Sequence, residues 1–158
     1  MNRSLRLALI AALVTGVGRA NSASPKQSDP SFSITIKAVE PEVKAGAEVY
    51  VRVRLTNTSQ REIMGGSGFH AQGLDTSYEY NCHDAGGKSV AKEIAPDGSL
   101  HDAPILKPGE SHEELAPVSR ACDLTRPGRY TIQLSRADPR DPRHTVVKSN
   151  TIAITVAP

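Results

Sequence analysis

The sequence has little of what large cores and membrane spans are usually built from. Aromatic residues make up only 4% of its 158 residues and Trp is absent, so the core has to be filled mainly by aliphatic side chains. No segment keeps a helical period for longer than two turns, which argues against a parallel α/β fold. The longest apolar run, residues 7–17, is much shorter than the roughly 20 residues that a transmembrane helix needs.

That apolar run has the features of a secretory leader. Arg3 and Arg6 precede it, and small residues follow it at positions 18–22. A basic start, a short apolar stretch and a small-residue cleavage site are the parts of a signal peptide. We therefore expect residues 1–22 to be a cleaved signal peptide. Because no Cys lies at the expected cleavage site, a bacterial lipid anchor is not expected.

The expected leader also carries the excess of positive charge. It holds three of the 19 basic residues and none of the 17 acidic ones, which leaves the rest of the chain with a net charge of about −1. A nucleic-acid partner is not expected for such a chain. Residues 23–30 are predicted to be a disordered lead-in and residues 31–158 a single domain. This domain is expected to be periplasmic or secreted, with no membrane span after cleavage.

The chain has two cysteines, Cys82 and Cys122. In an exported protein, the simplest use of two cysteines is one disulfide bond. The alternative is a metal site that includes His83, which follows Cys82 directly. Zinc sites of this kind normally have a second pair of ligands at short spacing, and none flanks Cys122. The sequence therefore favours a disulfide between the two cysteines.

Short stretches of alternating apolar and polar residues recur along the chain, as in half-buried strands. Residues 49–55 are the clearest example, with Val or Leu at every second position. The predicted strands cover residues 32–38, 49–55, 76–82, 89–94, 111–118, 130–134 and 146–156. Residues 41–46 are expected to form a turn, whereas residues 63–73 fit no pattern. Seven to eight short strands separated by turns predict an all-β sandwich.

Two Pro-Gly pairs frame the predicted strands near the C-terminal end. Pro108-Gly109 stops the chain before one strand, and Pro127-Gly128 precedes another strand, which opens with Tyr130. Pro presets the backbone of a turn, and Gly tolerates the positive φ that many turns require. These five residues are therefore expected to have structural roles. For Tyr130, the alternatives are a simple core position and a hydroxyl that bonds back to the upstream backbone.

The pattern over residues 106–134 and 149–156 resembles the immunoglobulin-like domains of uncharacterised secreted bacterial proteins. The resemblance implies an immunoglobulin-like antiparallel β-sandwich with a tyrosine corner, in which a Tyr near the start of the strand bonds to the backbone upstream. Residues 106–111 and 128–131 are also similar, more distantly, to the proteinase-inhibitor domain first named from an intracellular bacillus inhibitor. This second resemblance implies inhibition of a proteinase.

The loop between the last two predicted strands is the best candidate for a contact site. Residues 138–144 contain two Asp-Pro-Arg repeats, and Pro lowers the entropy cost of ordering a loop on binding. Arg136, Arg140, Arg143 and His144 form a basic set that suits carboxylates or glycans. A passive hairpin loop is the alternative, because Asp-Pro also starts turns. The expected partner is an unidentified protein or glycan of the cell envelope.

Nothing in the sequence predicts a catalytic residue, a metal ligand or a cofactor site. Ser67 lies in a Gly-rich segment, but the Gly-x-Ser-x-Gly pattern of hydrolases is incomplete and no acidic partner can be assigned. The five histidines are not two or four residues apart, so no strand or helix brings them together. They are His70, His83, His101, His112 and His144.

These observations predict a non-enzymatic binding or accessory module that acts outside the cytoplasm. The motivation is a complete set of sandwich strands without a catalytic constellation. A proteinase inhibitor that acts through the exposed loop at residues 138–144 is the first alternative. A metal-binding or carrier protein is the second alternative, and it requires His or carboxylate side chains to converge in space.

Overall fold

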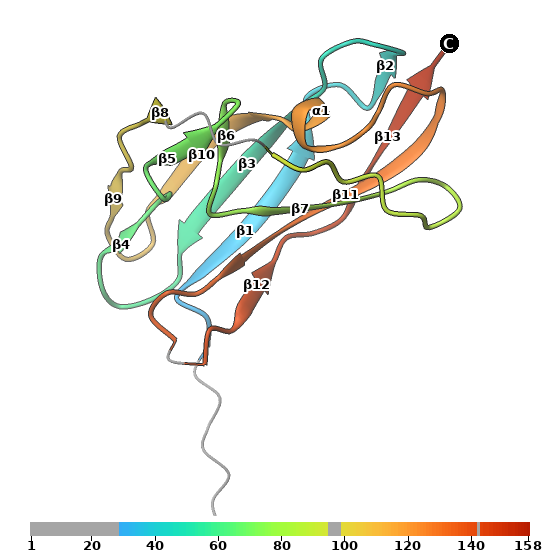
Figure 1. The fold of residues 1–158 in the computed structure, drawn as a ribbon. Coiled ribbons are helices and arrows are strands. Elements are labelled where there is room, and N and C mark those ends of the chain that lie inside the picture. Colours follow the sequence, from blue (N-terminus) through green and yellow to red (C-terminus); the bar gives the residue numbers. More distant parts are fainter. Residues whose placement is uncertain (1–28, 95–98, 142) are drawn as a thin grey trace, which may run out of the picture.

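The protein is an all-β fold that contains two larger sheets and two small ones (Figure 1). The computed structural model describes residues 29–94, 99–141 and 143–158. The expected signal peptide, residues 1–22, lies outside these residues, as does most of the expected lead-in. Within the described ranges, no helix has the length and hydropathy to cross a membrane.

The strands fall into four groups. The first sheet contains β1 (Phe32–Ala38), β3 (Tyr50–Asn57) and β10 (Ser111–Pro117). The second sheet contains β2 (Glu42–Lys44), β7 (Glu79–His83), β11 (Gly128–Ala137), β12 (Val146–Lys148) and β13 (Ile152–Ala157). The small sheets contain β4 (Ile63–Met64) with β9 (Ile105–Leu106), and β5 (Phe69–Ala71) with β6 (Leu74–Asp75) and β8 (Ser99–Leu100). A single helical turn, α1 (Val118–Ala121), follows β10.

The first sheet follows from the alternation of apolar residues in β1 and β3. Its order is β1-β3-β10, and both strand pairs are antiparallel. Ile34 of β1 lies opposite Leu55 of β3, and both side chains are buried. The side chains at alternate positions along β3 point outward, and these include Arg52 and Arg54. One guanidinium nitrogen of each lies 3.6 Å from a carboxylate oxygen of Glu113 in β10. Such exposed ion pairs add little stability, so the buried face holds this sheet in place.

The second sheet is organised around β11. This strand pairs with β7 along one edge, and with β13 and then β12 along the other. The strand predicted at residues 146–156 is divided in two, because Ser149 leaves the ladder and its Oγ accepts a hydrogen bond from the Leu134 amide (3.0 Å). Asn150 then reaches β1, where its side chain bonds both the amide (2.8 Å) and the carbonyl (2.9 Å) of Ile36. This contact satisfies backbone groups on an open edge of β1.

The inward-facing side chains of both larger sheets form one hydrophobic core. Its largest fully buried members include Leu55 of the first sheet and Ile132, Leu134 and Ile154 of the second. The core is mainly aliphatic, as the low aromatic content requires. Tyr130 is buried at its margin, and its hydroxyl donates a hydrogen bond to the carbonyl oxygen four residues upstream, at 2.8 Å. This contact has the form of a tyrosine corner.

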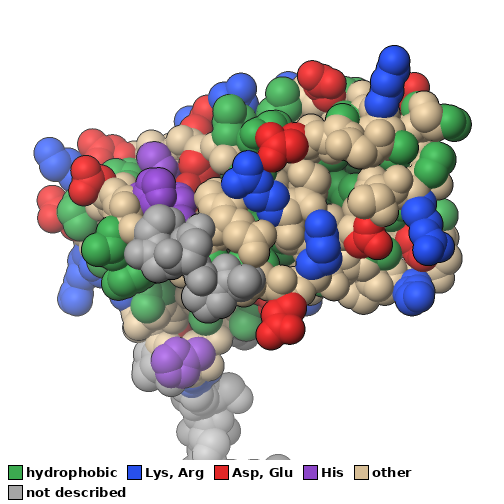
Figure 2. Space-filling view, turned by 45° about the horizontal axis from the view of Figure 1, so that its top comes forward, with side chains coloured by type: hydrophobic (Ala, Val, Ile, Leu, Met, Phe, Trp, Pro, Cys, Tyr) green, Lys and Arg blue, Asp and Glu red, His purple; other side chains and the backbone are tan. Residues whose placement is uncertain are grey.

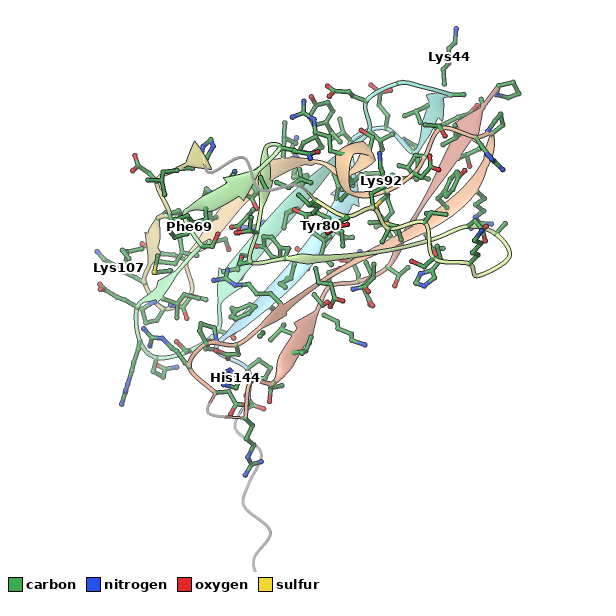
Figure 3. All side chains as sticks on the ribbon, viewed as in Figure 1. Lys44, Phe69, Tyr80, Lys92, Lys107 and His144 are labelled. Atoms are coloured by element: carbon green, nitrogen blue, oxygen red, sulfur yellow. A yellow bond between two sulfur atoms is a disulfide. The ribbon has the colours of Figure 1, made fainter. Side chains whose placement is uncertain are left out.

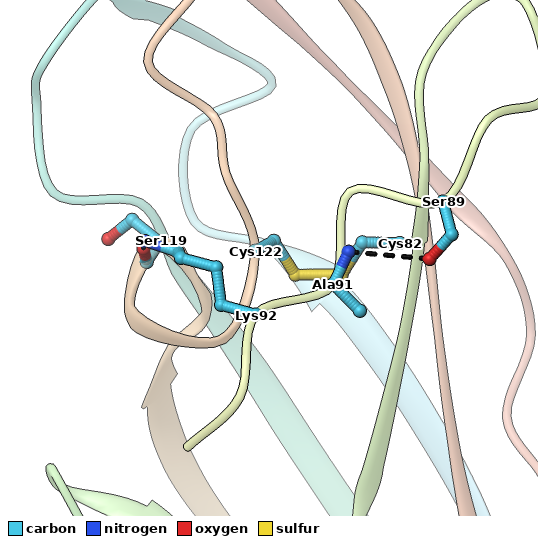
Figure 4. The surroundings of a disulfide bond; sticks show 6 residues. All are labelled: Cys82, Ser89, Ala91, Lys92, Ser119 and Cys122. Carbon is cyan, nitrogen blue, oxygen red and sulfur yellow. Dashed lines mark hydrogen bonds between the residues drawn. A yellow bond between two sulfur atoms is a disulfide. The ribbon is translucent and has the colours of Figure 1, made fainter. Parts of the chain in front are cut away.

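The structure contains the predicted disulfide bond, which joins β7 to the segment after α1 (Figure 4). Cys82 and Cys122 are fully buried, with their Cα atoms 6.1 Å apart. Residues 89–94, predicted to be a return strand, form only isolated bridges because they contact both β7 and the chain around Cys122. Lys92 strengthens this junction, since its Nζ donates to the Ser119 carbonyl at 2.7 Å.

Two turns differ in how far the sequence anticipates them. Gly109 has a φ of +80°, and the Glu110 amide donates to the Lys107 carbonyl at 3.0 Å, as a Pro-Gly turn requires. The turn predicted at residues 41–46 instead contains β2, which pairs in parallel with β13 and sets Val43 opposite Val156.

The described residues hold thirteen strand segments, more than the seven to eight expected, because seven segments span only two or three residues.

Candidate functional site

Five short strands, β4, β5, β6, β8 and β9, form a separate layer beside β10 (Figure 1). We call it the short-strand layer. Residues 63–73, which fitted no pattern in the sequence, supply a large part of it. Each pair of strands in this layer is joined over only two residues. Side-chain hydrogen bonds therefore matter more here than the backbone ladder does.

Asp75 of β6 organises the short-strand layer. Its side chain is 2% exposed and accepts hydrogen bonds from the Ser67 amide (3.1 Å), the Ser67 hydroxyl (2.7 Å) and the Ser77 amide (2.7 Å). Burial alone would raise the pKa of Asp75, but these hydrogen bonds outweigh it and hold the pKa below its ordinary value. Gly66 makes the close approach feasible, since a Cβ there would lie 2.6 Å from Asp75 Oδ2.

A second carboxylate lies close to Asp75. Glu114 of β10 is partly buried, and in the described part of the chain its carboxylate has no hydrogen bond or salt bridge. Burial raises the pKa of Glu114 to about 7; the charge of Asp75 adds to the rise and that of Arg136 opposes it. Glu114 is therefore ionised in only a part of the molecules at neutral pH.

His70 of β5 completes a group of three side chains that can act as metal ligands. One ligand atom from each of His70, Asp75 and Glu114 lies within 4.8 Å of the others. His70 and Asp75 are register partners in the β5–β6 pair, and Glu114 comes from β10. A search for ligands at short spacing along one strand or helix could not find this group, because its members come from three strands.

A second histidine lies against this group. The rings of His70 and His101 stack with their centroids 4.1 Å apart and an interplanar angle of 24°. Figure 2 shows histidine side chains together on this flank of the molecule, with hydrophobic side chains beside them. The apolar neighbours include Phe69 and Leu100, which are paired between β5 and β8 and are 58% and 73% exposed.

Two tyrosines lie near the carboxylates on their buried side. Tyr78 and Tyr80 are each 5% exposed, and Figure 3 shows Tyr80, a residue of β7, in the interior. Burial raises the pKa of both hydroxyls, and the negative charge of Glu114 raises it further. The Tyr80 hydroxyl has no hydrogen-bond partner among the described residues. Leaving such a group unpaired in a core costs about 1–3 kcal/mol.

Arg136 is a buried cation near the end of β11. It is 7% exposed, and its Cζ lies 5.2 Å from the ring centroid of Phe32 and 5.8 Å from that of Tyr78. Within the described ranges it has no salt bridge, and its Nη1 has no hydrogen-bond partner. The aromatic rings offset part of the cost of burying this charge. The Nη1 of the guanidinium group is still without a hydrogen-bond acceptor among the described residues.

Arg136 lines a pocket with a cavity volume of about 420 Å³, which we call the Arg136 pocket. Its walls are Ser31, Phe32, Ile63, Met64, Gly66, Ser67, Arg136, Pro139 and Arg140. The pocket thus lies between the first turn of the short-strand layer and the loop after β11. It combines an apolar wall with a buried cation and two hydroxyl groups, which is the usual make-up of a small-molecule site.

The structure divides the basic residues that the sequence grouped together. Arg136 and Arg140 line the pocket, whereas Arg143 and His144 are exposed outside its walls. Figure 3 shows His144 at the tip of the loop. The sequence identified Arg136 by its neighbours in the chain, but its burial on β11 could not be predicted. A run of polar residues around an Arg gives no signal for burial.

The loop at residues 138–144 is anchored at its base. Asp138 is 2% exposed and accepts hydrogen bonds from the amide (2.7 Å) and hydroxyl (2.8 Å) of Ser31. Arg140 donates to the Glu62 carbonyl and so ties the loop to the chain before β4. These contacts fix one wall of the Arg136 pocket.

Among the described residues, Ser67 is not part of a Ser-His-Asp arrangement of the hydrolase type. The structure supplies the acid that the sequence could not assign, but Ser67 Oγ donates directly to Asp75 Oδ1 at 2.7 Å. In a catalytic triad, a histidine lies between the nucleophile and the acid. Ser67 Oγ also accepts a hydrogen bond from the Phe69 amide at 3.0 Å. This hydroxyl therefore holds the Gly-rich turn in shape.

No protein-family model matches the chain, and no curated protein matches its sequence. Function is therefore inferred from the two features that the fold brings together: the Arg136 pocket and the group of His70, Asp75 and Glu114.

Proposed function

We propose that the protein is an exported, non-enzymatic binding module with an immunoglobulin-like β-sandwich, and that its ligand is a small carboxylate with an apolar body. The Arg136 pocket is the binding site. The observation that carries the proposal is the buried guanidinium group of Arg136, whose Nη1 has no hydrogen-bond partner.

Three features support the immunoglobulin-like and exported parts of the proposal. The two larger sheets share one core, and the Tyr130 hydroxyl bonds to the upstream backbone as in a tyrosine corner. The buried disulfide bond is typical of proteins that fold outside the reducing cytoplasm. The absence of a Ser-His-Asp arrangement at Ser67 favours binding over hydrolysis at this site.

The electrostatics of Arg136 favour an anionic ligand. Taking a cation out of water costs several kcal/mol unless an opposite charge compensates for it. Cation–π contacts with Phe32 and Tyr78 return about 0.5–2 kcal/mol, which leaves part of this cost uncompensated. A ligand carboxylate would compensate for the rest, because guanidinium and carboxylate groups form short, charge-assisted hydrogen bonds.

The other walls of the pocket determine the rest of the ligand. Phe32, Ile63 and Met64 form an apolar surface, so an aliphatic or aromatic body fits beside the carboxylate. Ser31 and Ser67 already use their hydroxyl groups in bonds to Asp138 and Asp75. Arg136 and Arg140 are therefore the main sources of polar specificity, and of the two only Arg136 is buried.

The proposal is tested with phenylacetate and its neutral counterpart phenylacetamide as probes. Both are titrated into isotope-labelled protein, exported and purified with its disulfide intact, while backbone amide signals are followed by NMR. We expect saturable shifts at Phe32, Ile63 and Ser67 with phenylacetate, and binding at least about tenfold weaker with the amide, or 1.4 kcal/mol. Equal binding of the two probes, or no saturation by phenylacetate at millimolar concentrations, would refute the proposal.

A pair of variants assigns the binding to the pocket. Arg136→Met removes the charge and keeps an apolar side chain of similar length, so phenylacetate binding should fall at least tenfold. Replacing a buried charge with an apolar side chain is often neutral for stability, and we expect the variant to fold. Arg143→Met is the matched control, because Arg143 lies on the same loop but outside the pocket. Similar losses in both variants would assign the binding to the net charge of the loop.

A further inference from the structure

We infer that the protein also binds a divalent transition-metal ion, for which Zn²⁺ is the best match, through His70, Asp75 and Glu114 of the short-strand layer and β10. None of these three residues lines the Arg136 pocket. The proposed metal ligands are therefore distinct from the pocket walls, and Zn²⁺ and carboxylate binding can be titrated separately.

The positions of the three ligand atoms suit a metal ion once the side chains move slightly closer to one another. They lie within 4.8 Å of one another. Zn–N and Zn–O bonds of about 2.0–2.2 Å place neighbouring ligands of a tetrahedral ion about 3.4 Å apart. Rotation of the Glu114 side chain, which has no hydrogen bond to another described residue, can supply much of this movement. Asp75 stays in place, because its hydrogen bonds to Ser67 and Ser77 hold it.

The charges around the site also favour a cation. Asp75 and Glu114 are two carboxylates at close range, and their mutual repulsion is relieved when a cation lies between them. Arg136 acts on Glu114 from a distance, but it forms no salt bridge with either carboxylate in the described part of the chain. A divalent ion would supply the missing positive charge where both carboxylates meet the His70 imidazole.

The buried hydroxyl of Tyr80 is an independent observation that indicates a ligand here. It is 95% buried and has no hydrogen-bond partner among the described residues. The charges of Glu114 and Asp75 both act on it, which places it near the metal-binding group. Protein metal sites commonly contain such a donor beside a ligating carboxylate, where it fixes the orientation of the carboxylate.

The donor atoms determine the class of metal. One imidazole nitrogen and two carboxylate oxygens suit Zn²⁺, and they lack the thiolate or thioether groups that select Cu(I). Ca²⁺ takes six to eight oxygen ligands, so it fits this set poorly. Three protein ligands leave one position of a tetrahedral Zn²⁺ ion open to solvent or to an external ligand.

The first test measures metal binding to the whole exported protein. The protein is purified without a polyhistidine tag, stripped with EDTA and titrated calorimetrically with Zn²⁺ and, separately, with Ca²⁺. We expect one Zn²⁺ per chain with a micromolar or lower Kd, and at least tenfold weaker binding of Ca²⁺. Co²⁺ in place of Zn²⁺ should give the visible absorption of a four- or five-coordinate ion. A Zn²⁺ affinity weaker than millimolar, or tighter binding of Ca²⁺, would overturn the inference.

Matched variants test the assignment of the ligands. Glu114→Gln removes a ligand charge without removing a hydrogen bond, and Zn²⁺ affinity should fall at least tenfold. Glu113→Gln is the control, because Glu113 is its neighbour in β10 but contacts Arg52 and Arg54 on the outer face. Likewise His70→Ala should weaken Zn²⁺ binding, whereas His112→Ala should not. Thermal unfolding in EDTA verifies that each variant is folded. Unchanged affinity in folded Glu114→Gln protein would show that Zn²⁺ binds elsewhere.

Discussion

The two larger sheets and the short-strand layer are held together by different forces. In the sheets, strands of up to ten residues pair along continuous ladders and bury aliphatic side chains. In the layer, strands of two or three residues are joined by polar side chains around Asp75, and Phe69 and Leu100 remain exposed. Cooperative stability is expected to come from the sheets, and binding chemistry from the layer and the loop beside it.

The difference has a physical consequence for substitutions. A buried aliphatic side chain in the sheets contributes through its packing, so its loss is felt by the whole fold. A carboxylate in the layer acts on ligand binding through its charge. That charge lowers the stability of the fold when the carboxylate is buried and lies close to a second carboxylate. Substitutions in the sheets should therefore lower stability, whereas some substitutions in the layer should raise stability and abolish binding.

The largest expected effect is in the core of the sheets. Leu134→Ala removes a side chain that is 0% exposed and should lower the free energy of unfolding by about 3–5 kcal/mol. Leu100→Ala is the matched substitution in the short-strand layer, and at 73% exposure it should change stability by less than about 0.5 kcal/mol. Urea unfolding of both variants measures the difference. Similar losses would contradict the proposed division between the two regions.

The disulfide bond should contribute slightly less. The bond closes a loop with a sequence separation of 40 residues, for which the chain-entropy model gives roughly 3–4 kcal/mol. Replacing Cys82 and Cys122 together with Ala should lower the stability by that amount, as measured by urea unfolding. Because the disulfide lies outside the short-strand layer, Zn²⁺ affinity of the folded double variant should stay unchanged. A loss of Zn²⁺ binding in folded protein would show that the two regions are coupled.

The sequence predicted the sheets far better than the layer, and the reason is physical. The strand at residues 32–38 coincides with β1, because an alternating strand with one buried face has a strong local signal. The disulfide was predictable because a chain with two cysteines has only one possible intramolecular pairing. The group of His70, Asp75 and Glu114 has no local signal, since β5, β6 and β10 meet only in the folded chain.

The sequence did not predict the Arg136 pocket, for a similar reason. The loop at residues 138–144 was identified by its Pro and Arg content, and two of its expected contact residues, Arg136 and Arg140, line the pocket. The opposite wall comes from residues 63–67, more than 60 positions away in the chain. Charge and turn propensity are local properties, whereas a cavity depends on which distant segments meet.

The next prediction concerns the cost of the Glu114 charge. Its pKa of about 7 in the folded protein lies above the ordinary value of 4.5, so the folded state binds the proton more tightly than the unfolded state does. Tighter proton binding by Glu114 in the folded state stabilises the protein, and this stabilisation is fully present below pH 4.5 and is lost as the pH rises through 7. In EDTA, Glu114→Gln should therefore raise the free energy of unfolding at pH 8 by about 1–3 kcal/mol.

The same variant should be nearly neutral at pH 4, where both the Glu and the Gln side chains are uncharged. Asp75, His70 and Arg136 are present in both proteins, so the difference between the two pH values isolates the carboxyl group of Glu114. Urea unfolding at both pH values is the measurement. Destabilisation at pH 8 would mean that Glu114 has a favourable partner in the folded protein.

The smallest expected change in stability comes from a substitution at Gly66, which contacts both candidate sites. Gly66 lines the Arg136 pocket, and a Cβ at this position would lie 2.6 Å from Asp75 Oδ2. Gly66→Ala should force the turn and Asp75 apart at a cost of about 1–2 kcal/mol, and it should weaken both Zn²⁺ and phenylacetate binding. Gly86→Ala, in the hairpin after β7, is the control. If Gly66→Ala weakens only one ligand, the two sites are held independently; if it weakens both, the Gly-rich turn positions them together.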